Sequence, residues 1–182
     1  MLSKVLSSAT YGIDAYLVEV ETNVERQIPG FTIVGLPDSA IKESRERVTA
    51  AIKNSGFDFP LKKITVNLAP ADIKKEGSAF DLPIAIGLLS AIEKINEHDL
   101  LDSVLLGELS LDGKLRPIKG ALPITVEARK KVIKRIILPT ESSIEASIVE
   151  GINVFGIENL KDVVSFLKNE LEIKSIKSDK NE

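Results

Sequence analysis

Apolar residues in the middle of the chain form a strand pattern followed by a helix pattern. Residues 64–68 are a short β-branched run that ends at Pro70, which predicts a strand. Residues 82–95 are apolar at most positions, which predicts a helix buried on most sides, with Asp81 as its expected N-cap. The polar loop at residues 70–81 joins the two, so a functional site is expected there.

The pattern before this unit predicts an antiparallel start and one amphipathic helix. Residues 2–9 and 15–24 alternate between apolar and polar positions around a turn, which predicts a hairpin, and residues 31–34 predict a third strand. A helix follows, with Asp38 or Ser39 as its cap and an apolar stripe at three- and four-residue spacing.

The second half of the chain alternates between strand and helix patterns. An Asp-Gly pair at residues 112–113 lies between apolar runs, which indicates another hairpin. Further helices are predicted at residues 121–132 and 141–150 and from Asn159, and further strands at residues 135–138 and 152–155.

Together these elements predict an α+β or mixed α/β domain, with a mixed sheet backed by helices, over residues 1–171. Residues 172–182 are polar and of mixed charge, which is typical of a tail or linker.

Composition narrows the classes of function. The chain has 182 residues, 43% hydrophobic and 28% charged, and no apolar run approaches the ~18 residues of a membrane helix, so we expect no membrane contact. The chain has no cysteine, and its N-terminus does not resemble a secretion signal, which favours a cytoplasmic location.

Charge limits the contacts with nucleic acid. With a net charge of −3 and only 4% aromatic residues, binding to DNA would need a local basic patch. The candidates for such phosphate contacts are Arg45, Arg47, Lys74 and Lys75, although short runs of mixed charge are usually solvated surface.

Two features resemble ligand sites but have simpler interpretations. Residues 107–115 place five residues between their glycines where a P-loop has four, and Leu115 stands where a hydroxyl must reach magnesium. His98, the only histidine, has no second histidine or cysteine nearby and is expected on a surface connector. We therefore expect no nucleotide site and no metal ligand at these positions.

The loop at residues 70–81 carries its own candidates. Asp72, Glu76 and Asp81 could bind magnesium through oxygen ligands, but a structural role is favoured. Ser78 follows a glycine and could act as a nucleophile. No histidine is available to activate it, so its base would have to be a lysine with a depressed pKa.

Three stretches of the sequence resemble the N-terminal domain of the YifB/ComM family of magnesium-chelatase-like AAA+ ATPases. They are GLPDSAIKESRERV at residues 35–48, LAPADIKKEGSAFDLP at residues 68–83 and GELSLDGKLRPI at residues 107–118. The resemblance implies the ribosomal-protein second-domain fold seen in Lon peptidases. It also implies an AAA+ motor after residue 182 that binds ATP and Mg²⁺, a hexameric full-length protein, and DNA branch migration during natural transformation.

Lon peptidases use a serine nucleophile and a lysine base, and the resemblance shows which residues of this sequence stand at the two positions. It places Ala79 at the nucleophile position, although a shift of one residue would place Ser78 there. It places Leu122 at the position of the base, and Lys119 lies three residues earlier. The resemblance therefore implies a peptidase fold without its catalytic pair.

Three hypotheses follow from the sequence. The leading one is a non-catalytic domain that assembles, regulates or presents substrate to its own AAA+ motor, without catalytic, cofactor or metal residues in this chain. The second is a peptidase that uses Ser78 and Lys119, and the third is a free-standing module that binds nucleic acid.

Overall fold

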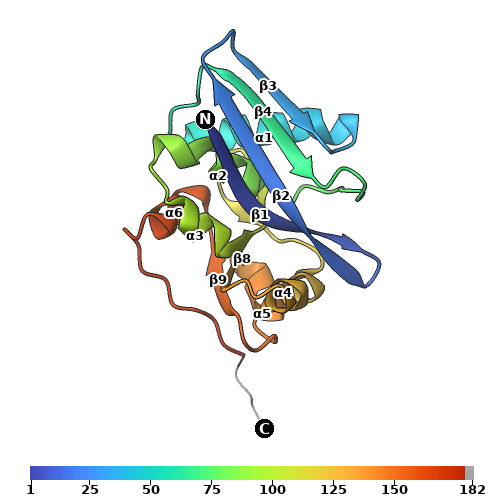
Figure 1. The fold of residues 1–182 in the computed structure, drawn as a ribbon. Coiled ribbons are helices and arrows are strands. Elements are labelled where there is room, and N and C mark those ends of the chain that lie inside the picture. Colours follow the sequence, from blue (N-terminus) through green and yellow to red (C-terminus); the bar gives the residue numbers. More distant parts are fainter. Residues whose placement is uncertain (179–182) are drawn as a thin grey trace.

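The centre of the computed structural model, which describes residues 1–178, is a sheet of seven strands (Figure 1). The strands of this sheet are β1 (Leu2–Tyr11), β2 (Asp14–Glu25), β3 (Gly30–Val34), β4 (Lys63–Ala69), β5 (Ser103–Leu105), β8 (Arg135–Pro139) and β9 (Asn153–Ile157). A separate hairpin pairs β6 (Glu108–Leu109) with β7 (Leu115–Arg116) around the predicted Asp-Gly turn.

The strand order is β3-β4-β2-β1-β5-β8-β9, so β3 and β9 lie at the two edges. β1 pairs with β2 in antiparallel fashion, as the alternating sequence pattern predicts, and β2 also pairs with β4 in antiparallel fashion. The pairs β3–β4, β1–β5, β5–β8 and β8–β9 are parallel. The predicted mixed sheet is therefore confirmed.

Helices cover both faces of the sheet (Figure 1). They are α1 (Asp38–Asn54), α2 (Asp81–Ile92), α3 (Glu97–Leu101), α4 (Ala121–Lys130), α5 (Thr140–Ala146) and α6 (Leu160–Leu167). One core lies between the sheet and α1, α2 and α6, and a second core lies between the sheet and α4 and α5. The predicted class, a mixed sheet backed by helices, is confirmed.

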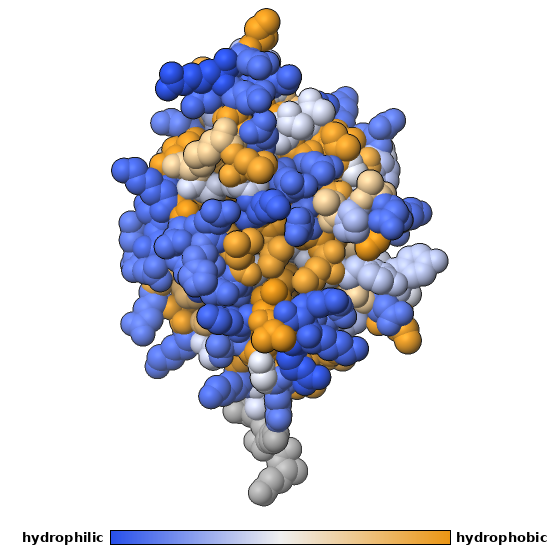
Figure 2. Space-filling model, in the orientation of Figure 1, coloured by the Kyte–Doolittle hydropathy of each residue, from blue (hydrophilic) through white to orange (hydrophobic). Residues whose placement is uncertain are grey.

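The two cores follow from the alternation of side chains along a strand. In β1, Val5 faces the first core and Leu6 packs against the second. In β8, Ile137 and Ile136 divide in the same way. The face with the second core is in view in Figure 2, where apolar side chains gather in the middle and lower part of a mostly hydrophilic surface.

Helix α2 is buried along most of its length, as its all-round apolar sequence predicts. It packs on β2 so closely that a Cβ atom at Gly87 would lie 2.5 Å from the hydroxyl oxygen of Thr22. Among residues 1–178, no helix is both long enough and apolar enough to cross a bilayer.

Both predicted helix caps are wrong. Residue 80 is the N-cap of α2, and the carboxylate of Asp81 is bound elsewhere. Pro37 is the N-cap of α1, so neither Asp38 nor Ser39 caps it, and no side chain bonds to its first turn as a cap. The predicted start at Asn159 is confirmed, since its side chain accepts a hydrogen bond from the backbone N–H of Asp162 at 2.8 Å.

Other differences concern short or terminal segments. The sequence pattern missed α3, whose start is capped by Asn96. Of the polar segment 172–182, residues 179–182 lie outside the described residues. Within 172–178, Ile176 forms an antiparallel bridge with Val154 of β9, and its N–H donates to the Val154 carbonyl at 2.8 Å. This segment therefore extends along the edge of the sheet.

Candidate functional site

A cleft of about 560 Å³ lies where the loop before α2 meets the end of β1 and the segment that leads into α4. The loop contributes residues 76–80, β1 contributes residues 8–10, and the third wall is residues 117–119. The part of the predicted loop that lines a cavity is therefore residues 76–80.

Ser78 and Lys119 both line this cleft. Ser78 is partly buried and Lys119 is exposed. Within residues 1–178, the hydroxyl of Ser78 makes no hydrogen bond, to Lys119 or to any other group. A nucleophile needs a base within about 2.6–3.2 Å, so the cleft holds the two groups without the contact that would activate the serine.

The two positions that the resemblance assigns to catalysis hold apolar side chains. Ala79 packs against the second core. Leu122 lies partly buried in the first turn of α4, and its backbone N–H donates to the carboxylate of Glu145 at 3.1 Å. Neither side chain can transfer a proton or attack a carbonyl, so the cleft lacks the chemistry of a Ser-Lys peptidase at these positions.

Close packing fixes the start of α4 beside the cleft. Gly120, its N-cap, has a φ of 77°, and a Cβ atom there would lie 2.6 Å from the side-chain methyl of Thr10. A larger residue would be strained in that conformation and would push the helix away from β1. The close packing of Gly120 against Thr10 therefore fixes where α4 starts, and with it the position of Leu122.

A buried polar cluster lies at the other side of the same loop, around Asp81. Arg47 donates to Asp81 through Nε at 2.7 Å and through Nη2 at 3.1 Å. Ser44 donates its hydroxyl at 2.8 Å, and the backbone N–H of Leu109 donates at 3.1 Å. The cluster joins α1, the start of α2 and the β6–β7 hairpin at one carboxylate.

The charges in this cluster depend on each other. The side chain of Asp81 is 1% exposed, and burial raises the pKa of its carboxyl, while the hydrogen bonds from Arg47, Ser44 and Leu109 act in the opposite direction. The hydrogen bond to Asp81 raises the pKa of Arg47. Four donor atoms from these three residues bind one carboxylate, which is the arrangement of a structural cluster.

Lys75 is a second buried charge in the loop. It is 2% exposed, and its ammonium donates to the carbonyl oxygens of Pro70 and Ile73, the latter at 2.6 Å. Burial lowers the pKa of Lys75. Its side chain also lies close to Gly35, where a Cβ atom would approach Lys75 Cε to 3.3 Å. Lys75 therefore holds the loop in shape from inside.

The four predicted phosphate contacts do not form one patch. Arg45 donates to the carbonyl of Phe31 at 2.9 Å, and Lys74 pairs with Glu76 at 3.6 Å on the exposed loop. Lys75 is buried, and the guanidinium of Arg47 is bound to Asp81, so neither presents a free cation at the surface.

The remaining ligand candidates do not make a site. The P-loop-like stretch is a hairpin whose turn packs on α1, because a Cβ atom at Gly113 would lie 2.3 Å from the hydroxyl of Ser55. Such a turn does not fit a nucleotide phosphate. His98 is exposed and lies 3.7 Å from Asp102. Among residues 1–178, no group of three or more His, Cys, Asp or Glu side chains could hold a metal ion, so the acidic loop residues do not converge.

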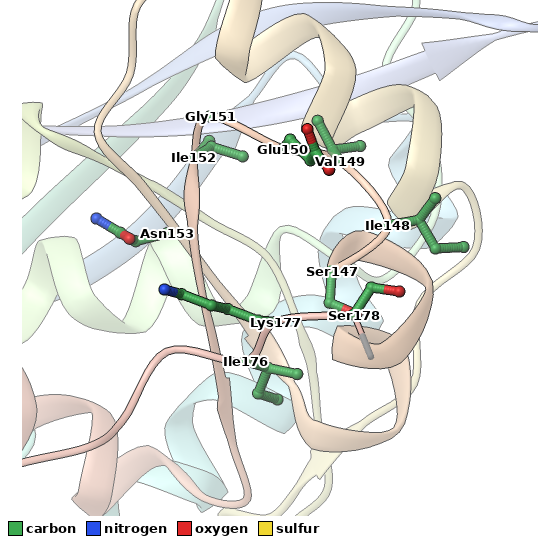
Figure 3. Close-up of a pocket in the computed structure, with 10 residues that line it drawn as sticks. All are labelled: Ser147, Ile148, Val149, Glu150, Gly151, Ile152, Asn153, Ile176, Lys177 and Ser178. Carbon is green, nitrogen blue, oxygen red and sulfur yellow. The ribbon is translucent and has the colours of Figure 1, made fainter. Parts of the chain in front are cut away.

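A second cavity, larger than the cleft, is lined by none of these residues. It has a volume of about 820 Å³, and residues 147–153 and 176–178 line it (Figure 3). Three isoleucines, Ile148, Ile152 and Ile176, give it an apolar character, and Lys177 also lines it. Because it holds no cluster of reactive side chains, the cleft at residues 76–80 is the better candidate.

Sequence reasoning missed the role of the buried cluster. Ser44 falls on the apolar stripe of α1, and a serine among buried positions is a signal that it has a polar partner. The partner, Asp81, is 37 residues away, and Leu109 is a further 28 residues along the chain. Nothing local in the sequence joins these three positions.

Comparison with known proteins gives one family. Residues 20–142 match the family described as subunit ChlI of Mg-chelatase. The chain is 42% identical over 169 residues to competence protein ComM of Haemophilus influenzae, with 93% of this chain and 33% of ComM covered. It is also 42% identical over 167 residues to the uncharacterized protein YifB of Escherichia coli, with 92% and 33% covered.

A more distant relative carries the likeness to peptidases. Lon protease 2 of Bacillus subtilis is 28% identical over 128 residues, which cover 69% of this chain and 22% of that protease. The chain spans about a third of the length of ComM and YifB. On the family match and these two relatives, the chain belongs to the magnesium-chelatase-like family of subunit ChlI, as a homologue of ComM and YifB.

Proposed function

We propose that this chain is a non-catalytic domain of a magnesium-chelatase-like AAA+ ATPase, which serves the assembly of the motor, its contact with DNA or its regulation. The observation that carries the proposal is the cleft at residues 76–80. Ala79 lines this cleft at the position that the resemblance assigns to the nucleophile, and Leu122, in the first turn of α4, stands at the position that it assigns to the base.

The rest of the proposal concerns the full-length protein. Its supports are the likeness to a protein named competence protein ComM and the share of about one third that the chain covers. On this basis the full-length protein would be a cytoplasmic hexamer that binds ATP and Mg²⁺ in its motor and drives branch migration of DNA during natural transformation.

One experiment tests the non-catalytic part on the chain itself. The purified 182-residue chain is incubated with ATP and Mg²⁺, and separately with unfolded casein. We expect no hydrolysis of either above a heat-denatured sample of the same chain. Turnover of ATP would contradict the assignment to a domain without a motor.

A second experiment tests the proposed architecture. The gene is read downstream of the codon for Glu182, where Walker A and Walker B motifs are expected. A reading frame that ends without them would overturn the proposal that this domain serves an ATPase.

One observation favours a second candidate, a peptidase that uses Ser78 and Lys119. Both residues line the same cleft. Cleavage of casein that disappears in Ser78→Ala and in Lys119→Met would establish this function and reject the first one.

A further inference from the structure

Two surfaces at opposite edges of the sheet carry complementary side chains. The first, which we call the α1 groove, has a volume of about 680 Å³ and lies between α1 and β3. The second, which we call the α5 ridge, is the exposed face of α5 and of the turn after it. Its members are Glu141, Ile144, Glu145 and Ile148.

The α1 groove has an apolar floor and a basic rim. The floor includes Phe31 and Ala50, and the rim carries Lys42, Arg45 and Lys53. None of these three cations is in an ion pair within the described part of the chain. Arg45 donates through Nη1 to the carbonyl of Phe31 at 2.9 Å and keeps further donors for a ligand.

The α5 ridge has the opposite character. Its four members follow each other at three- and four-residue spacing, so they share one helical face. Ile144 is 72% exposed and Ile148 is 59% exposed, beside the carboxylates of Glu141 and Glu145. Neither carboxylate forms an ion pair within residues 1–178, and one oxygen of Glu145 accepts the hydrogen bond from the backbone N–H of Leu122, which leaves its second oxygen for a partner. Exposed isoleucines grouped with like charges are typical of a contact surface.

The two surfaces cannot meet within one molecule. α1 lies beside β3 and α5 packs on β8 and β9, so the two helices lie towards opposite edges of the sheet, and the edge strands β3 and β9 are six strand spacings apart. At about 4.8 Å between neighbouring strands, the separation is roughly 29 Å. Figure 1 shows α1 and α5 towards opposite ends of the molecule.

We infer that the α5 ridge of one copy of this chain docks into the α1 groove of the next copy, head to tail. The isoleucines would cover the apolar floor, and the two glutamates would face the lysines of the rim. A contact between two different surfaces leaves one of each unsatisfied at the ends, so it closes only as a ring or continues as a filament. The inference rests on the proposed function only where that function includes ring assembly.

Nucleic acid is the less suitable occupant of the groove. Glu46 lies in its lining among the cations, and the apolar floor offers nothing to a phosphate backbone. The net charge of −3 also opposes a polyanion. A ridge with carboxylates beside apolar side chains matches both parts of the groove, and this chain carries such a ridge.

The contact is small, so the affinity between free chains should be weak. In a full-length ring, neighbouring domains would be held at an effective concentration of roughly millimolar, at which a weak contact is populated. The experiment on the free chain must therefore extend to about 1 mM.

A charge exchange between the two surfaces tests the inference by sedimentation equilibrium. The groove variant is Lys42→Glu with Lys53→Glu, and the ridge variant is Glu141→Lys with Glu145→Lys. Each variant alone brings like charges together, so self-association should weaken at least about 10-fold. An equal mixture of the two variants again pairs opposite charges, so association should return to within about threefold of the original chain.

The control replaces two lysines that belong to neither surface, Lys130→Glu with Lys161→Glu. It changes the net charge by the same amount as the groove variant. It should associate as the original chain does, and association should fall as salt is raised. Recovery in the mixture also shows that both variants are folded.

Several outcomes would overturn the inference. These are a chain that stays monomeric to about 1 mM, a species that stops at a dimer, and a mixture that shows no recovery. Binding of a single-stranded oligonucleotide that is lost in the groove variant, without self-association, would assign the groove to nucleic acid instead. Each of these results leaves the assays for ATP and casein unchanged, so a failure here is distinct from a failure of the proposed function.

Discussion

The loop before α2 has two sides, and they differ in how their polar groups are used. On one side, Asp81 receives hydrogen bonds from Arg47, Ser44 and Leu109 in the protein interior. On the other side, the hydroxyl of Ser78 lines an open cleft and has no partner among residues 1–178.

The difference indicates which side of the loop contributes to the free energy of unfolding. A buried polar group is costly unless its partners are present, so loss of a partner in the cluster around Asp81 should lower the free energy of unfolding. A hydroxyl at the surface of a cleft has no such requirement. The loop is therefore held by its buried side, and its cleft side is free to change without loss of the fold.

The largest expected effect comes from removal of the central acceptor. Asp81→Ala removes the acceptor shared by Ser44, Leu109 and Arg47 and leaves Arg47 only its pair with Glu43 at 3.8 Å, so we expect the free energy of unfolding to fall by about 3 kcal/mol. Urea denaturation measures the change. Asp72→Ala, an exposed carboxylate in the same loop, is the control and should change stability by less than about 0.5 kcal/mol. Equal effects of the two variants would contradict the claim that the buried side of the loop contributes more to stability than its exposed side.

The next effect concerns the buried lysine of the loop. Lys75→Met leaves the carbonyl oxygens of Pro70 and Ile73 without a donor, and we expect a loss of about 1–3 kcal/mol. Lys74→Met, the exposed neighbour, should have an effect below about 0.5 kcal/mol. A neutral result for Lys75→Met would show that the ammonium does not hold the loop.

Lys75 also predicts a dependence on pH. Burial lowers the pKa of Lys75 below its ordinary 10.5, so the folded state loses this proton before the unfolded state does. The unfolded state then binds more protons, and the stability of the original chain relative to Lys75→Met should rise between the lowered pKa and 10.5. Urea denaturation of both proteins across this range measures the difference. A flat or falling difference would contradict the assignment.

A smaller effect is expected at the edge of the cluster. Ser44→Ala removes one of the hydrogen bonds to Asp81 and leaves the others, so we expect a loss of about 1–2 kcal/mol. Ser39→Ala, an exposed serine in the first turn of the same helix that makes no capping hydrogen bond, is the matched control, with a change below about 0.5 kcal/mol. The thermal midpoints of the two variants should differ accordingly.

The smallest effect is expected in the cleft. Ser78→Ala and Lys119→Met should each change the free energy of unfolding by less than about 0.5 kcal/mol, because neither side chain makes a hydrogen bond within residues 1–178 that would be lost. A loss above about 1 kcal/mol in both would indicate a contact between the two residues that the account does not include.

The sequence predicted the parts of the fold that depend on local pattern. The burial of α2, the hairpin at residues 112–113 and the start of α6 at Asn159 follow from neighbouring residues. The short helix α3 was missed because a single turn of five residues has no periodic signal to detect. The bridge between Ile176 and Val154 of β9 is a single pair of residues, so it also gives no periodic pattern in the sequence.

The site depended on contacts between distant segments, and sequence reasoning failed there. Asp81 has the residue type and position of a cap, but its partners come from α1 and from the β6–β7 hairpin. The sequence predicts phosphate contacts at Arg47 and Lys75, since a basic residue next to charged neighbours gives no sign that its partners lie inside the protein. Only the family resemblance indicated that the segment at residues 117–119 would face the loop at residues 76–80.

The most direct test of the central claim is whether the hydroxyl of Ser78 is a nucleophile. The chain is treated with a serine-directed phosphonate probe, and its mass is measured intact and after digestion, with Ser78→Ala as the reference. The account predicts no adduct at Ser78 above the level of an exposed serine such as Ser39. A stoichiometric adduct on Ser78 that disappears in Lys119→Met would show an active pair and contradict the account.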